Sequence, residues 1–129
     1  MATIGMAGLS KWPERPQLSS RASVMVLPFR NSSGDLGEDY IADAVTDDLT
    51  TDLSRLSDTL VIARATAFAY KGKAVDVRDI GREFGVRYIL EGSVGRVGTR
   101  VQANAELIDT SSAAAIWADR FNTDLTSPS

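Results

Sequence analysis

The chain has 129 residues, of which 43% are hydrophobic and 24% are charged, the composition of one ordinary soluble domain. It contains no cysteine and no histidine, which excludes disulfides, thiolate metal sites and histidine-based catalysis. The net charge of −3 argues against a general affinity for nucleic acid, because phosphate binding requires a basic surface.

The first 21 residues, MATIGMAGLSKWPERPQLSSR, match neither a folded element nor a secretion signal. Pro13 and Pro16 favour an extended leader, and a signal peptide would need a basic start followed by a long apolar run. Apolar runs elsewhere are far shorter than the roughly 18 residues of a membrane span. We therefore expect a cytoplasmic rather than a periplasmic location, without membrane contact. Residues 1–21 are expected to form the leader, residues 22–125 the folded domain, and residues 126–129 a tail cut from a longer chain.

Residues 22–63 predict a strand, a crossover helix and a second strand. ASVMVLPF (22–29) is a continuous apolar run too short for a helix, typical of a buried strand. The loop RNSSGDLG follows, and residues 38–57 predict an amphipathic helix. Its apolar stripe consists of Ile41, Val45, Leu49, Leu53 and Leu56. TLVIA (59–63) predicts another buried strand, so the unit is parallel and right-handed.

YKGKAVDVRDIGREFG (70–85) allows two interpretations, a phosphate-binding loop or a short helix with specified ends. A phosphate loop would need a glycine pattern such as G-x-x-x-x-G-K-[ST], which the chain lacks. Asp76 can cap a helix, with Asp79 near the position of a capping-box acid and a staple between Val75 and Ile80. Gly85 provides the glycine stop. The helix interpretation accounts for these residues, and phosphate binding stays the alternative.

The remaining sequence predicts an antiparallel meander. VRYILEGSVGRV (86–97) predicts a strand, and Gly98-Thr99 fits a two-residue hairpin turn. Alternation in RVQANAELID predicts a half-buried strand, and AAAIWADRF predicts a last strand with Trp117 and Phe121 on one face. The expected fold class is α/β, with a mixed five-stranded sheet in which a parallel β-α-β-α-β part is followed by the meander.

An acidic row on the first long helix could bind a cation. Asp39, Asp43 and Asp47 recur every four residues, a spacing at which like charges repel. A hard cation would take ligands from a turning loop rather than from one straight helix. We therefore interpret the row as a solvated face, and we predict no metal, no cofactor and no catalytic residue.

Topology favours a binding site at the loops that follow the parallel strands, because ligands of open α/β sheets bind beyond the carboxyl ends of such strands. Residues 30–35 and 64–73 form these two loops. Their polar side chains define a predicted rim for a small molecule or a peptide carboxylate: Arg30, Asn31, Ser32, Ser33, Arg64, Thr66, Tyr70, Lys71 and Lys73. The alternative is that these loops only connect elements.

Several segments together resemble a known family. VLPFRNSSGD, YKGKAVDVRDIGREFGVRYILEGSV, ELID and WADRF resemble the TolB amino-terminal-like module of bacterial adenylate and guanylate cyclase-type multidomain proteins. The resemblance covers residues 22–125. It implies a TolB amino-terminal-like fold, and a parent protein such as a class III adenylate cyclase whose catalytic domain lies outside this chain. It transfers no catalytic residue.

The sequence thus favours a non-catalytic regulatory or interaction module of a bacterial signalling protein. Its partners would be neighbouring domains or another protein, with a homodimer allowed and nucleic acid excluded. The alternative is a nucleotide-binding or cyclase-related enzymatic domain in its own right.

Overall fold

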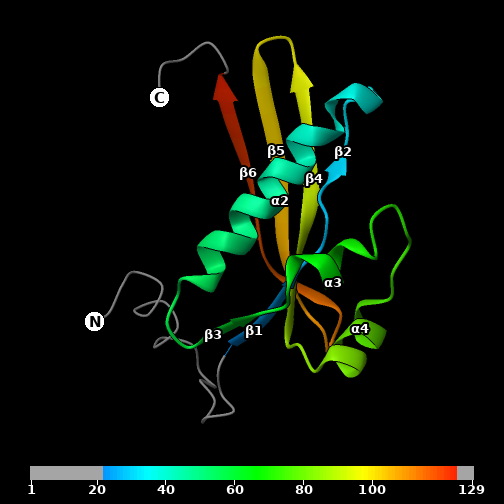
Figure 1. Ribbon diagram of the computed structural model, residues 1–129, viewed down its shortest axis with the longest axis vertical. Helices are drawn as coiled ribbons and strands as arrows, with labels where there is room; N and C mark the ends of the chain where they lie inside the picture. The colour runs from blue at the N-terminus through cyan, green and yellow to red at the C-terminus, as the bar shows by residue number, and fades with distance from the viewer. Residues whose placement is uncertain (1–21, 125–129) are drawn as a thin grey trace.

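The computed structural model describes residues 22–124, which form one six-stranded mixed sheet with helices on both faces (Figure 1). The strand order is β3-β1-β4-β5-β6, and β2 pairs with β4 off this path. The strands are β1 (Ala22–Val26), β2 (Arg30–Asn31), β3 (Thr59–Val61), β4 (Tyr88–Val97), β5 (Arg100–Asp109) and β6 (Ala114–Asp124). The helices are the 3-10 turn η1 (Leu36–Glu38), α2 (Asp39–Ser54), α3 (Arg64–Phe68) and α4 (Val77–Phe84).

The pairing confirms the predicted fold class. β1 pairs in parallel with β3 and β4, and β4, β5 and β6 form the antiparallel meander. The predicted leader (1–21) and tail (126–129) lie outside the described residues.

The sheet has one strand more than the five predicted, because the chain pairs with β4 a second time after β1. Pro28 has no N–H to donate and interrupts the ladder. The chain then resumes parallel pairing with β4 at Arg30 and Asn31. The predicted strand 22–29 therefore ends at Val26, and β2 lies in the segment that was predicted as a loop.

Residues 59–61 form an edge strand, so the prediction that this segment is buried was wrong. Within residues 22–124, β3 pairs only with β1, and Leu60 is 50% exposed. Its short apolar run has the composition of a central strand, but position in the sheet depends on the order of strands rather than on local sequence.

Side-chain alternation along β1 builds two cores, one on each face of the sheet. Val24 and Val26 face α2, where the stripe Ile41, Val45, Leu49 and Leu53 packs against them. Met25 and Leu27 face the opposite side, where they pack with residues of α3 and α4.

The segment 70–85 forms the expected helix α4. The Asp76 carboxylate accepts the Arg78 N–H at 2.9 Å, and Gly85 ends the helix with a φ of 67° in the left-handed region. Asp79 forms an ion pair with Arg82 one turn further on. These residues shape and stabilise a helix.

Candidate functional site

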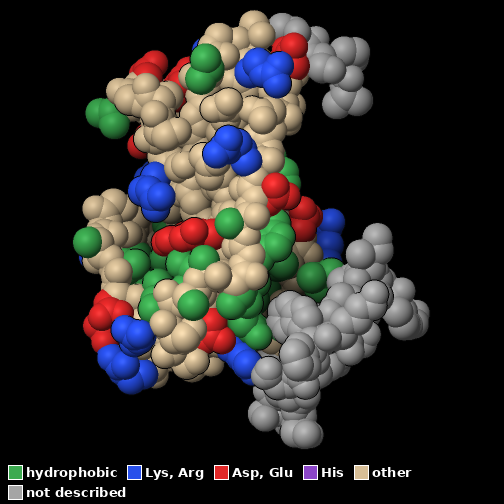
Figure 2. All heavy atoms as spheres, turned by 180° about the vertical axis from the view of Figure 1, so that it is seen from behind, with side chains coloured by type: hydrophobic (Ala, Val, Ile, Leu, Met, Phe, Trp, Pro, Cys, Tyr) green, Lys and Arg blue, Asp and Glu red, His purple; other side chains and the backbone are tan. Residues whose placement is uncertain are grey.

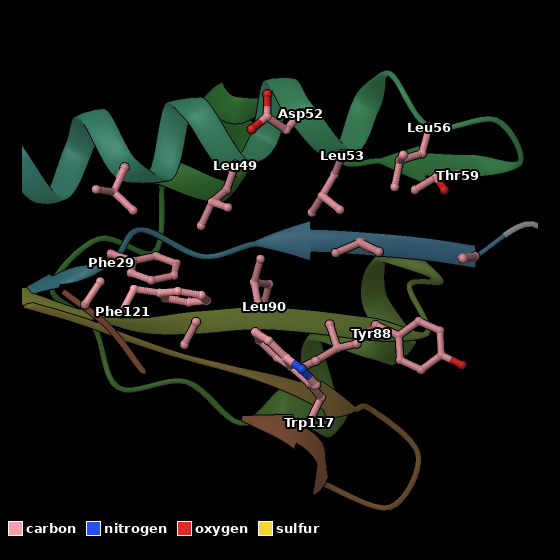
Figure 3. Close-up of a pocket in the computed structure, with 16 residues that line it drawn as sticks. Phe29, Leu49, Asp52, Leu53, Leu56, Thr59, Tyr88, Leu90, Trp117 and Phe121 are labelled. Atoms are coloured by element: carbon pink, nitrogen blue, oxygen red, sulfur yellow. The ribbon is translucent and has the colours of Figure 1, made fainter. Parts of the chain in front are cut away.

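A large apolar groove lies between α2 and the sheet (Figure 3). It has a volume of about 570 Å³. Its walls come from α2, from β1, β3, β4, β5 and β6, and from Phe29 and Leu56 in the adjoining loops. The lining residues are Ala22, Val24, Phe29, Val45, Leu49, Asp52, Leu53, Leu56, Thr59, Tyr88, Leu90, Ala103, Ala105, Leu107, Trp117 and Phe121. We call this set the α2 groove.

Small side chains on β5 create the hollow. In Figure 3, Leu49 and Leu53 point from α2 toward the sheet, and Asp52 points away from the apolar interior. Ala103 and Ala105 lie on the floor, where larger residues would have met the helix. Because protein interiors are close-packed, two adjacent alanines beneath one helix leave space that no described side chain fills.

The outer wall of the groove is the edge strand β6, whose described residues are all exposed. Trp117 and Phe121 lie on one face of it, as predicted, with ring centroids 6.5 Å apart. Their exposed fractions are 45% and 47%. Large exposed aromatic side chains beside an apolar groove are typical of surfaces that bind another segment of protein.

Three members of the predicted rim line one cavity. Arg30, Tyr70 and Lys73 line a cavity of about 470 Å³ with Glu91. This cavity lies at the carboxyl end of β1, the position that topology predicts. Glu91 had not been predicted as a site residue, because it is on β4 and far from either loop in sequence.

Asn31 and the two serines after it hold their own loop in shape. The Asn31 side-chain amide donates to the Asp35 carbonyl at 2.7 Å and to Asp39 Oδ1 at 2.8 Å, and Asn31 Oδ1 accepts from the Ser33 hydroxyl at 2.6 Å. The Ser32 N–H donates to the Val94 carbonyl at 2.8 Å. These polar groups are engaged in closing the loop.

Arg64 and Lys71 contact the acidic row of α2. Lys71 Nζ lies 2.9 Å from Asp43 Oδ2 and 3.9 Å from Asp39 Oδ2, and Arg64 pairs with Asp47. The row is thus a half-exposed face, and its ion pairs with the segment that follows β3 are contacts that the interpretation as a solvated face did not include.

Thr66 lies within α3, a helix that was not predicted inside the loop 64–73. Ala67 of this helix is buried against the second core, which explains why such a short helix forms.

A pair of glutamates lies on the face of the sheet opposite α2, because the residues next to them in sequence, Leu90 and Leu107, face the α2 side. Figure 2 shows the molecule from behind, where acidic and basic side chains lie close together above a hydrophobic region. Glu91 and Glu106 are directly opposite each other on β4 and β5. They line a cavity of about 410 Å³ with Arg30, Asn104 and Arg120 among its walls. Burial raises the pKa of Glu91, the charge of Glu106 and a hydrogen bond to it raise it further, and Arg30 opposes the shift.

Two searches of residues 22–124 gave negative results. No group of three or more Asp, Glu, His or Cys side chains there is arranged to hold a metal ion. No helix in the same range has the length and apolar character needed to cross a membrane.

Comparison with known proteins shows a relative in sequence. A protein of Rhizobium meliloti (strain 1021) named "Putative adenylate cyclase 3" is 50% identical over 110 residues. This match covers 85% of the chain, which spans only 19% of the length of that relative.

Solved structures share the fold at lower identity. Lipoprotein GNA1162 from Neisseria meningitidis superposes with a TM-score of 0.62 at 23% identity, covering 80% of each chain. TolB from Acinetobacter baumannii superposes with a TM-score of 0.56 at 14% identity, covering 81% of this chain and 23% of TolB. Both likenesses support the TolB-like fold class and nothing beyond the fold.

A family model described as "HilA/YgeH-like transcriptional regulator, second domain" matches residues 20–128. Because this match includes all the described elements, the chain belongs to the family of second domains of HilA/YgeH-like transcriptional regulators.

Proposed function

We propose that this domain is a non-catalytic regulatory and interaction module of a larger bacterial signalling protein of the adenylate cyclase type. The α2 groove receives an apolar segment of protein, from a neighbouring domain or a partner. The observation that carries this proposal is the open groove of about 570 Å³ beside the half-exposed Trp117 and Phe121. An aromatic anchor next to a preformed apolar groove is the arrangement that dominates binding energy at protein interfaces.

The comparisons support a module that is independent of any one catalytic activity. The family consists of second domains of transcriptional regulators, whereas the 50% identical relative carries the name of an adenylate cyclase. We take a domain shared by transcriptional regulators and an adenylate cyclase-type protein to perform neither transcriptional regulation nor cyclase catalysis itself. We propose further that it is the TolB amino-terminal-like module of cyclase-type proteins, with a class III catalytic domain outside the matched stretch.

Hydrogen exchange in the Rhizobium relative tests this function. Its segment matching this chain would be measured alone and within the full-length protein. We expect the strand that matches β6 to exchange more slowly in the full-length protein, because the docked segment covers the groove and the strand edge. Equal exchange in the two forms would refute the proposal, and the strand that matches β1, already buried, serves as the internal control.

A nucleotide site is the second candidate, favoured by Arg30, Tyr70 and Lys73 in one cavity. Glu91 in the same cavity weighs against it, because an acidic side chain repels phosphate. ATP with Mg²⁺ at a hundred times its dissociation constant would stabilise the protein by about 2.7 kcal/mol. We expect no such thermal shift and no cyclic nucleotide product. A shift lost in Lys73→Ala would favour this candidate over the interaction module.

A further inference from the structure

We infer that the segment received by the α2 groove binds as an added β-strand on the open edge of β6, with alternating apolar and basic side chains. The inference rests on the proposed function, because it states the form and the chemistry of the segment that docks. The Rhizobium relative extends far beyond the stretch that matches this chain, which spans only 19% of its length. We place the docking segment in that remainder.

The two edges of the sheet differ in how well they are protected. Natural sheets protect an edge with a very short strand, a proline or a lysine. The edge strand β3 has only three residues, whereas β6 has eleven and contains neither proline nor lysine. Within residues 22–124, β6 pairs only with β5. One long side of β6 is therefore open to another segment.

One hydrogen bond of β6 shows which backbone groups are open. The Arg120 N–H donates to Oδ1 of the preceding residue, Asp119, at 2.8 Å, which places this N–H on the side of β6 away from β5. The pairing of β6 with β5 is regular from Trp117 onward. Because the backbone groups of an antiparallel strand alternate between its two sides, those of Ala118 and Asn122 point to the open side as well. An added strand would hydrogen-bond to these three residues.

The open edge is continuous with the α2 groove. Trp117 and Phe121 of β6 line the groove, and Phe121 is paired with Ala103 on its floor. Side chains of neighbouring strands lie side by side, with Cβ atoms about 4.5–5.5 Å apart. Every second side chain of an added strand would therefore enter the groove beside the two aromatic residues.

The size of the groove favours side chains over a whole helix. A helix with its side chains is about 10–12 Å wide, so two of its turns, about 11 Å long, occupy on the order of 900 Å³. The groove has about 570 Å³. A strand at the edge of β6 can fill this volume with apolar side chains while its own backbone lies outside the groove.

Charge determines which residue is expected between the apolar ones. Asp119 lies between Trp117 and Phe121 on β6, and Asp52 of α2 lines the groove. Within residues 22–124, neither carboxylate forms an ion pair. Because opposite charges directly across two strands stabilise a sheet, the residue that faces Asp119 should be basic. The occupant should thus follow the pattern apolar-x-basic-x-apolar.

Arg120, the basic residue of β6, does not neutralise this acidic border. Its side chain lies on the other face of the sheet, where Nε donates to Asn104 Oδ1 at 3.1 Å. A basic residue of the added strand would draw the Asp119 carboxylate away from the Arg120 N–H, and this N–H would then donate to the added strand. The same carboxylate covers the open edge without a partner and binds the partner when it docks.

Hydrogen exchange resolved to single amides tests the inference in the Rhizobium relative. The segment that matches this chain would be compared with the full-length protein. The amides at the positions matching Ala118, Arg120 and Asn122 should exchange about tenfold or more slowly in the full-length protein, because they gain partners. The amides matching Trp117 and Phe121, which already point to β5, should change less.

Two substitutions in the full-length relative test backbone and charge separately. The equivalent of Arg120→Pro removes the open N–H, and an edge strand tolerates proline at a position whose N–H faces outward. It should abolish the slower exchange at the positions matching Ala118 and Asn122. The equivalent of Arg120→Ala is the matched control and should retain the slower exchange. The equivalent of Asp119→Lys should reduce the slower exchange, because it repels the basic residue of the added strand.

The outcomes separate the inference from the proposed function. Slower exchange spread evenly over the strand matching β6, and unchanged by the proline, would overturn the inference and leave the proposed function standing. Equal exchange in the segment and the full-length protein would refute both. Slower exchange of the isolated segment at higher protein concentration would identify a second copy as the occupant and would also overturn the inference.

The strand that matches β1 reports whether each variant is folded, since it should stay equally protected in all of them. If the proline variant lost this protection, the equivalent of Asp119→Lys would decide. Full retention of the slower exchange in that variant would overturn the inference, and its loss with β1 still protected would support it.

Discussion

Replacing Thr46 by Val should destabilise the domain through one hydrogen bond between α2 and the sheet. Thr46 is 0% exposed. Its hydroxyl donates to the Ala42 carbonyl at 2.9 Å and accepts the Phe29 N–H at 2.8 Å. The Phe29 N–H lies where Pro28 has interrupted the β-ladder, so the threonine hydroxyl replaces a missing strand partner.

The expected cost follows from the group left without a partner. Valine has nearly the same shape, so little packing is lost, but the Phe29 N–H stays buried without an acceptor. Such a donor costs about 1–3 kcal/mol. The Ala42 carbonyl keeps its ordinary helical hydrogen bond and contributes little to this cost.

Thr50→Val is the matched control. The Thr50 hydroxyl donates to the Thr46 carbonyl at 2.8 Å, four residues earlier, as the Thr46 hydroxyl does to Ala42. The Thr50 hydrogen bond, however, lies entirely within the helix. Its replacement should change the free energy of unfolding by less than about 0.5 kcal/mol. Urea unfolding followed by circular dichroism, at unchanged m-value, measures both variants. If Thr46→Val proved as stable as Thr50→Val, the bond would not be what holds α2 at this point.

Three further substitutions test other parts of the structure. Gly92→Ala would place a Cβ 1.9 Å from the Asn104 carbonyl oxygen, so urea unfolding should show a loss of about 3 kcal/mol or more. Lys71→Met removes an exposed ion pair with Asp43 and should cost less than about 1 kcal/mol in the same assay. Glu91→Gln should alter the pH dependence of unfolding: burial raises the native pKa of Glu91 above 4.5, so the native state binds more protons. Stability should therefore be highest below that value and fall as pH rises through the native pKa. The variant should lack this fall above pH 4.5, and a curve identical to that of the parent would contradict the assignment.

Local signals in the sequence were sufficient for elements whose ends are set by their own residues. Helix α4 was predicted because Asp76 and Gly85 mark its ends by side-chain capping and by a left-handed backbone. The turn at Gly98 was predicted for the same reason, and its φ of 64° confirms it. By contrast, β2 consists of two residues whose only reason to be a strand is pairing with β4. No pattern within two residues can predict pairing with a strand as distant in sequence as β4.

The candidate site was predicted only in part. The cavity at the carboxyl end of β1 follows from the order of strands and loops, whereas the α2 groove depends on how side chains pack between the helix and the sheet. Topology indicated the two loops that carry Arg30, Tyr70 and Lys73, which line one cavity, but it did not indicate that Lys71 and Arg64 pair with the acids of α2. The α2 groove exists because the sheet presents more apolar surface on this face than the single helix α2 can cover. One amphipathic stripe on α2 faces the apolar residues of four strands, and it cannot cover them all. That signal was present in the sequence as the shared face of Trp117 and Phe121, beside the alternating alanines of β5.

The alanines on the groove floor allow the proposed docking to be separated from stability. Ala103→Leu should fill the hollow beneath α2 and bury additional apolar surface, which would raise the free energy of unfolding by about 1 kcal/mol. The same leucine would occupy the space of a docked segment, so the equivalent substitution in the full-length Rhizobium relative should remove the slower exchange of the strand that matches β6. Stabilisation at the expense of docking is the trade-off expected where a native hollow serves binding. Ala105 is 7% exposed, and enlarging it should instead overpack the core and destabilise the domain by about 1–3 kcal/mol. If Ala103→Leu were equally destabilising, the floor would be a packed core position, and no segment of protein could dock there.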